Sequence, residues 1–155
     1  MKRKALYIIF AVILACLAMA FVETVIRPGY AVKSCIKLLL FTGTVYALGV
    51  RGLFHREGLG LGIALGGAIF AVILGAFFLC RPFLDLEAIA AGLLDKEGVS
   101  RENFLWVALY ISIVNSLLEE LLFRGLAYLK LRKHTSEGFA AIFSAAAFAA
   151  YHIAI

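Results

Sequence analysis

The sequence is poor in charged residues. Asp, Glu, Lys and Arg make up 16% of its 155 residues, and 64% are hydrophobic. A soluble domain is only about 45–50% apolar. This balance leaves too few polar side chains to cover a water-exposed surface, so a soluble globular domain is excluded. We expect an integral membrane protein surrounded by lipid.

Cysteine is also scarce. Cys16, Cys35 and Cys80 are odd in number, form no CxxC pair and lie within or beside apolar runs. Neither a disulfide framework nor a thiolate metal site is therefore expected. The net charge is +5, but the basic residues are scattered at the ends of apolar segments. This distribution indicates membrane topology rather than nucleic-acid binding.

Long apolar runs are what the sequence has instead. A membrane-spanning helix needs about 20 apolar residues, and the chain holds five such runs. The expected fold class is all-α: a polytopic transmembrane helix bundle with about five spans plus one interfacial helix. We treat 1–155 as a single membrane domain, in which 1–103 hold the N-terminal spans and 104–155 two further helices. The expected spans are residues 5–22, 31–50, 58–80, 104–129 and 138–155.

The first run follows a basic N-terminus, Met1-Lys2-Arg3-Lys4. Its residues Ala18-Met19-Ala20 also fit the cleavage site of a signal peptide. We favour a retained helix whose basic end lies in the cytoplasm. Lys33 and Lys37 lie near the start of the second span, where long side chains can snorkel to the interface.

Two further patterns concern helix packing and position in the membrane. Gly58, Gly62 and Gly66 recur at every fourth residue, a pattern that allows membrane helices to approach closely. Residues 83–95 place their apolar side chains on one helical face, which is typical of an interfacial helix.

The fourth span carries charge inside an apolar run. Glu119, Glu120 and Arg124 would each cost about 2.5–3.5 kcal/mol near the centre of a membrane helix. They should therefore face the bundle interior or a wet cavity. We expect the functional site on this polar face, where Ser112, Ser116, Glu120 and Arg124 form one row and Asn115 and Glu119 the next.

The last span ends with Phe148 and His152 on one face, four residues apart. At 1.5 Å per residue, Glu119 lies about 16 Å from Lys130, and His152 about 20 Å from Phe139. The two helices must be antiparallel neighbours, so Glu119 and His152 can meet within the membrane. A carboxylate that takes a proton from water, beside an imidazole that orients the water, suits hydrolysis.

These residues resemble a known family. EELLFR at 119–124 matches the EExxxR motif, and FAAYH at 148–152 the FxxxH motif, of the CPBP intramembrane proteases. That family, also called Abi, includes type II CAAX prenyl proteases and bacterial proteins linked to bacteriocin processing or immunity. The resemblance covers about residues 104–155.

The resemblance implies a role for each matching residue. Glu119 would be the general base for the attacking water and His152 an active-site histidine. Glu120 and Arg124 would form a supporting pair, with Asn115 and Phe148 beside them. The substrate would be a peptide or protein, in some members prenylated. The bacterial members of the family point to a bacterial cytoplasmic membrane as the location. The family's mechanism has been interpreted both with and without a metal; a zinc ion, if present, would bind Glu119 and His152.

One part of the family pattern does not follow. The family places another histidine, with Asn four positions on, in a later helix, whereas this chain stops three residues after His152. His55 and His134 lie in polar loops outside that pattern. We therefore expect the 155-residue chain to lack the C-terminal part of the site and to hydrolyse peptide bonds poorly by itself.

Less specific interpretations stay open. Glu120 and Arg124, four residues apart, can be a structural ion pair. Since Arg124 can neutralise only one carboxylate, Glu119 would keep a buried charge without a partner, which favours a functional role. The whole chain can also be a non-catalytic member of the family that acts in bacteriocin immunity or as a binding scaffold.

Overall fold

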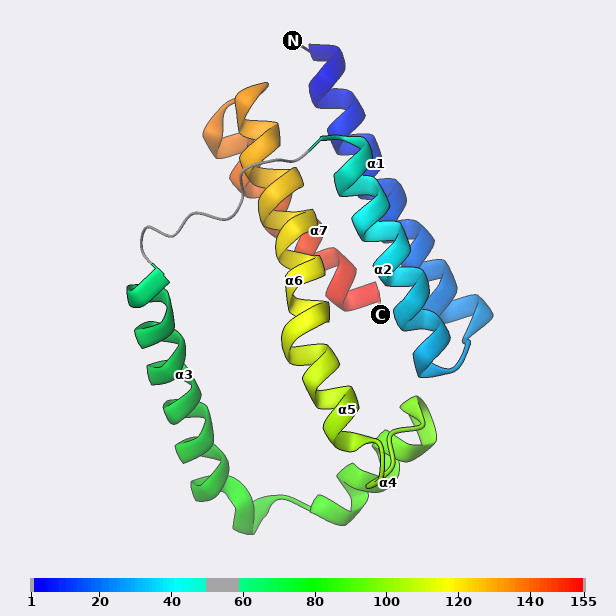
Figure 1. The fold of residues 1–155 in the computed structure, drawn as a ribbon, viewed down its shortest axis with the longest axis vertical. Helices are drawn as coiled ribbons and strands as arrows, with labels where there is room; N and C mark the ends of the chain where they lie inside the picture. The colour runs from blue at the N-terminus through cyan, green and yellow to red at the C-terminus, as the bar shows by residue number, and fades with distance from the viewer. Residues whose placement is uncertain (1, 50–58, 155) are drawn as a thin grey trace.

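The computed structural model describes residues 2–49 and 59–154, which form helices joined by turns (Figure 1). Within these ranges there is no strand, and the expected all-α fold class is confirmed. In chain order the elements are α1 (Lys2–Phe21), η1 (Val22–Ile26), α2 (Tyr30–Ala47), α3 (Leu59–Cys80), η2 (Arg81–Phe83), α4 (Leu86–Glu97), α5 (Phe104–Leu109), η3 (Tyr110–Asn115), α6 (Ser116–Glu119), η4 (Glu120–Lys130), η5 (Leu131–Lys133) and α7 (Glu137–Ala154).

Four helical segments of the described chain are long and apolar enough to cross a membrane. The fifth expected span is α2, which forms a helix of 18 residues but is not among the four. Its two lysines, Lys33 and Lys37, lower its hydropathy. The four candidate spans are Arg3–Ile26, Gly60–Phe83, Phe104–Lys133 and Glu137–Ala154.

The core begins with one stripe along α1 and the first residue of η1. Its buried residues follow one another at intervals of three and four, the spacing that keeps one face of a helix against its neighbours. This face packs against α2, η4 and α7. The first span is thus an integral part of the bundle core, to which it contributes Ala5, Ile8, Val12, Ala15, Met19 and Val22.

The helix from Phe104 to Lys133 and helix α7 form the other half of the bundle. They are joined by a short turn, and α7 packs along η4. The antiparallel pairing expected for the two motif-bearing helices is therefore present. Helix α2 packs against the same η4 segment, and the Lys130 ammonium donates to the carbonyls of Leu48 and Gly49 at its C-terminus. These are carbonyls that a helix end leaves without intrahelical donors.

Helix α3 stands apart from this bundle (Figure 1). Residues 60–80 are exposed throughout, and no side chain comes within 4 Å of the position a Cβ would take at Gly62 or Gly66. The close helix contact expected at these glycines is thus not made with the described residues. Gly58, the first glycine of the pattern, lies outside them.

Helix α4 is the segment for which we expected an interfacial helix. The Asp85 carboxylate accepts a hydrogen bond from the Ala88 amide at its N-terminus. Gly98 ends it with a positive φ of 64°, a conformation that glycine adopts without a Cβ clash. The helix has 12 residues, too few to span a bilayer.

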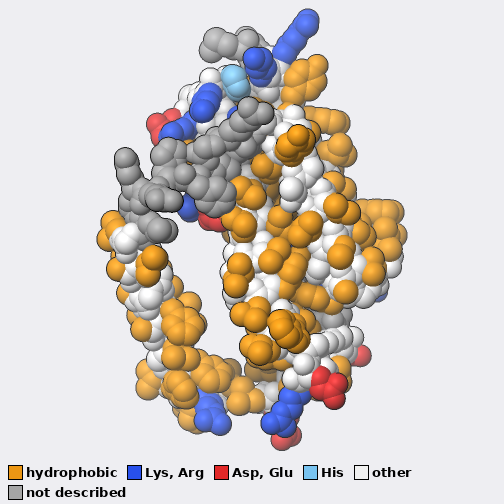
Figure 2. Space-filling view, in the orientation of Figure 1, with side chains coloured by type: hydrophobic (Ala, Val, Ile, Leu, Met, Phe, Trp, Pro, Cys, Tyr) orange, Lys and Arg blue, Asp and Glu red, His pale blue; other side chains and the backbone are white. Residues whose placement is uncertain are grey.

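The charged side chains lie mainly toward the two ends of the molecule. Figure 2 shows both signs of charge at each end of the molecule, with Lys and Arg more numerous at the end that holds the N-terminus, and mainly hydrophobic side chains between the ends. The turn between η5 and α7 lies toward the N-terminal end, and α4 at the other (Figure 1). This arrangement suits a bundle that crosses an apolar layer.

We expect a cysteine placed in α3 to be shielded by lipid. In a variant whose natural cysteines are replaced, Ala68→Cys should resist a membrane-impermeant maleimide in intact vesicles, whereas His134→Cys in the η5–α7 turn should react from one side. Mass spectrometry of the labelled protein measures both. Labelling of Ala68→Cys as fast as of His134→Cys would contradict the spanning position of α3.

Candidate active site

Glu119 is the last residue of α6 and its side chain is only 15% exposed. Its Oε1 accepts two hydrogen bonds, at 2.7 Å from Lys37 Nζ and at 3.0 Å from Asn115 Nδ2. Asn115 lies one turn earlier on the same helix. The carboxylate is therefore held by a cation from α2 and by an amide from its own helix.

His152 approaches the other oxygen of this carboxylate. Its Nε2 lies 3.7 Å from Glu119 Oε2, and its Nδ1 lies 2.9 Å from the carbonyl oxygen of Phe148. A carbonyl can only accept, so Nδ1 carries the hydrogen and, in neutral imidazole, Nε2 is left as an acceptor. A gap of 3.7 Å is too long for a direct hydrogen bond but can be bridged by a water molecule.

Lys37 is the residue at this site that the sequence analysis misplaced. We expected it to snorkel toward the membrane interface, but it is only 7% exposed and points into the bundle. The buried carboxylate that was thought to lack a partner therefore has one. The signal was present in the sequence, since a charged residue inside a membrane helix indicates a partner in the bundle. Lys33, one turn earlier on α2, pairs with Glu23 at 3.1 Å.

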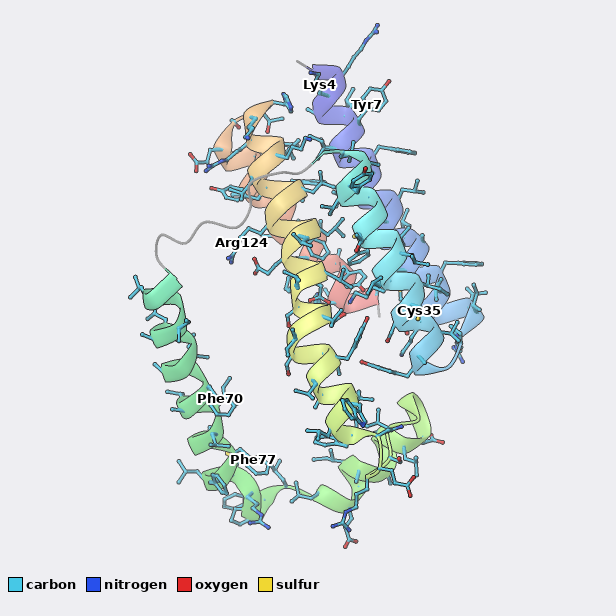
Figure 3. The ribbon with its side chains drawn as sticks, viewed as in Figure 1. Lys4, Tyr7, Cys35, Phe70, Phe77 and Arg124 are labelled. Carbon is cyan, nitrogen blue, oxygen red and sulfur yellow. The ribbon has the colours of Figure 1, made fainter. Side chains whose placement is uncertain are left out.

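Glu120 and Arg124 lie on a different side of the helix from Glu119. Arg124 Nε is 3.1 Å from Glu120 Oε2, and the two side chains are largely exposed. Figure 3 shows Arg124 projecting away from the bundle core on the side toward α3. The motif thus supplies one buried carboxylate and one ion pair at the surface.

Aromatic rings enclose the buried side of the site. The Phe148 ring packs on the His152 imidazole with centroids 4.2 Å apart, and on Phe123 with centroids 5.2 Å apart. Tyr151 lies against both Phe123 and Phe41. Phe148 therefore fixes the imidazole twice, through its carbonyl oxygen and through its ring.

Two cavities meet at Glu119. The larger, of about 540 Å³, has Lys37, Asn115 and His152 on its polar wall and extends to apolar side chains of α4 and α5, among them Leu93 and Phe104. The smaller, of about 520 Å³, is lined by Glu119 with Glu120 and Arg124. Glu119 is thus accessible from two sides although it is largely buried.

The described residues do not fit a zinc site at this place. A catalytic zinc is usually held by three protein ligands, whereas only Glu119 and His152 are found together here, and no group of three His, Cys, Asp or Glu occurs in residues 2–49 and 59–154. The Lys37 ammonium, 2.7 Å from Glu119 Oε1, would also repel a cation. His134 lies in the turn before α7, and His55 lies outside the described part.

Residues 101–155 match the family model described as type II CAAX prenyl endopeptidase, Rce1-like. The match includes the helix that carries Glu119 and the helix that carries His152. It confirms that this part of the chain resembles the CPBP family, as its two motifs indicated. No curated protein and no solved structure matches the chain.

The Tyr151 hydroxyl generates a test of the packing around the site. It is buried and has no hydrogen-bond partner among the described residues. Tyr151→Phe removes this unsatisfied group. The free energy of unfolding should therefore stay the same or rise by up to about 1–3 kcal/mol, and the unfolding temperature should follow it. Circular dichroism of the detergent-solubilised protein measures it.

Tyr110→Phe is the matched control. The Tyr110 hydroxyl donates to the Ser34 carbonyl at 3.3 Å, so its removal should lower stability by about 1 kcal/mol. A clear loss of stability in Tyr151→Phe would show that its hydroxyl has a partner in solution.

Proposed function

We propose that this protein is an intramembrane endopeptidase that resembles type II CAAX prenyl proteases. In this proposal Glu119 is the general base, and it activates a water molecule in a cavity within the membrane. The observation that carries the proposal is the 3.7 Å gap between Glu119 Oε2 and His152 Nε2, two acceptors that one water molecule can bridge with its two hydrogens.

The chemistry follows from that arrangement. With both hydrogens directed at acceptors, the water presents a lone pair to a peptide carbonyl. Glu119 takes one proton as the new C–O bond forms, and it returns a proton to the amine as the C–N bond breaks. His152 orients the water, and Phe148 holds the imidazole. Asn115 supports Oε1 of the base.

Glu120 and Arg124 support the site in a different way. The two side chains form their own ion pair outside the bundle. Glu120 therefore does not compete with Glu119 for the Lys37 ammonium, and Arg124 does not compete with Lys37 for the Glu119 carboxylate. Since no zinc site fits the described residues, the proposed steps use side chains alone.

The larger cavity supports a peptide substrate with an apolar part. Its polar wall lies at Glu119, and its apolar side chains lie toward α4 and α5. In this proposal the prenyl group of a prenylated peptide lies against the apolar side chains, and the peptide bond lies at Glu119. The proposed location is a bacterial cytoplasmic membrane, as the family resemblance implied. The family match favours the protease over a non-catalytic immunity or scaffold protein.

Glu119→Gln should lower the rate of hydrolysis by at least about 10³-fold, because the variant keeps the shape of the side chain and loses the base. The assay uses a fluorogenic peptide with a prenylated C-terminal CAAX sequence in liposomes. It is run on residues 1–155 and on the natural full-length product.

Glu102→Gln is the matched control, since the same change is made at an exposed residue of the turn before α5. It should leave turnover unchanged. If the natural product hydrolyses the peptide and Glu119→Gln hydrolyses it equally fast, Glu119 is not the base.

A further inference from the structure

We propose that Lys37 is a positioning residue of this site: its ammonium holds Oε1 of Glu119, so that Oε2 faces His152. The inference rests on the proposed function, because it assigns Lys37 a part in the hydrolysis. Neither the EExxxR nor the FxxxH motif includes this residue, which lies 82 positions before Glu119 on another helix.

The burial of Lys37 is the first observation. Among the residues whose burial the structure describes, it is the one charged residue that is buried as a whole. An isolated ammonium in an apolar interior is strongly unfavourable, and it persists only with a paired charge and well-formed contacts. Its partner is Glu119 at 2.7 Å, a short charge-assisted hydrogen bond.

The second observation is that Lys37 is itself held in place. Its ammonium lies 5.4 Å from the centroid of the Phe41 ring and 5.0 Å from that of the Tyr151 ring, within the range of cation–π attraction. Phe41 follows one turn later on α2, and Tyr151 precedes His152 on α7. The cation is therefore fixed by the helix that also carries the active-site imidazole.

The third observation concerns the two oxygens of the carboxylate. Oε1 accepts hydrogen bonds from both Lys37 and Asn115, whereas Oε2 is the oxygen that faces His152. Because Oε1 is occupied, proton transfer is directed to Oε2. Without Lys37 the carboxylate could rotate, and either oxygen could turn away from the imidazole. A misplacement of about 1 Å can cost about 100-fold in rate.

The first part of the test needs no activity. Lys37→Met, Glu119→Gln, the double variant and the wild type, each as the natural full-length product, are compared by thermal unfolding in detergent. Each single variant leaves a buried polar group without its partner and should unfold about 10 °C lower. The double variant should recover most of that loss. Strictly additive shifts would overturn the pairing, and with it the proposal.

Lys130→Met is the control for loss of a structural lysine. Its ammonium caps α2 without contacting Glu119. Its shift in unfolding temperature should therefore simply add to that of Glu119→Gln.

The second part separates a positioning role from a merely structural one. With the prenylated fluorogenic peptide, Lys37→Met should lower kcat about 100-fold and change KM less than about 3-fold, at a temperature where all variants stay folded. Lys37→Arg, which restores a cation, should recover at least about a tenth of the lost kcat.

Unchanged kcat in Lys37→Met, with Glu119→Gln inactive, would overturn the positioning role and leave the proposed function intact. Wild-type turnover that is absent or independent of Glu119 would overturn the proposed function and, with it, the catalytic part of the inference.

Discussion

The ion pair between Lys37 and Glu119 is the interaction on which the site depends. It joins α2 to α6 in a bundle whose other buried residues, where burial is described, belong to the hydrophobic core. Two charges in such an interior are tolerated only as a pair, and removing one leaves the other uncompensated. Helix α2 therefore has to keep its position along η4, where the rings of Phe41 and Tyr151 also lie within cation–π distance of the Lys37 ammonium.

The helical architecture could be predicted from the sequence because apolar composition and run length determine it directly. Runs of about 20 apolar residues have few alternatives to membrane helices, and the described elements follow the expected ranges closely. Helix α2 shows where this reasoning stops. Length and composition alone place it outside the candidate spans because of its lysines, yet the bundle pairs both lysines with acids, Glu23 and Glu119.

The site was predictable in part. Glu119 and His152 could be brought together from their depth along adjacent antiparallel helices, because helix geometry converts residue counts into distances. The partner of Glu119 could not be found in this way. Lys37 is 82 positions away, and its side chain is long enough either to snorkel or to point inward. Which of the two occurs depends on the packing of α2 against the motif-bearing helix, and periodicity does not encode that packing.

The two adjacent glutamates of the motif illustrate how local geometry divides chemical roles. Successive residues of a helix point about 100° apart, so Glu119 and Glu120 cannot face the same neighbour. Glu119 meets the buried Lys37 inside the bundle and approaches the half-exposed His152, whereas Glu120 meets Arg124 at the surface. Because each carboxylate has its own cation, the Arg124 guanidinium does not compete with Lys37 for the buried Glu119 carboxylate. The motif therefore places a carboxylate in an apolar interior together with a compensating charge from another helix, and in this protein that helix is α2.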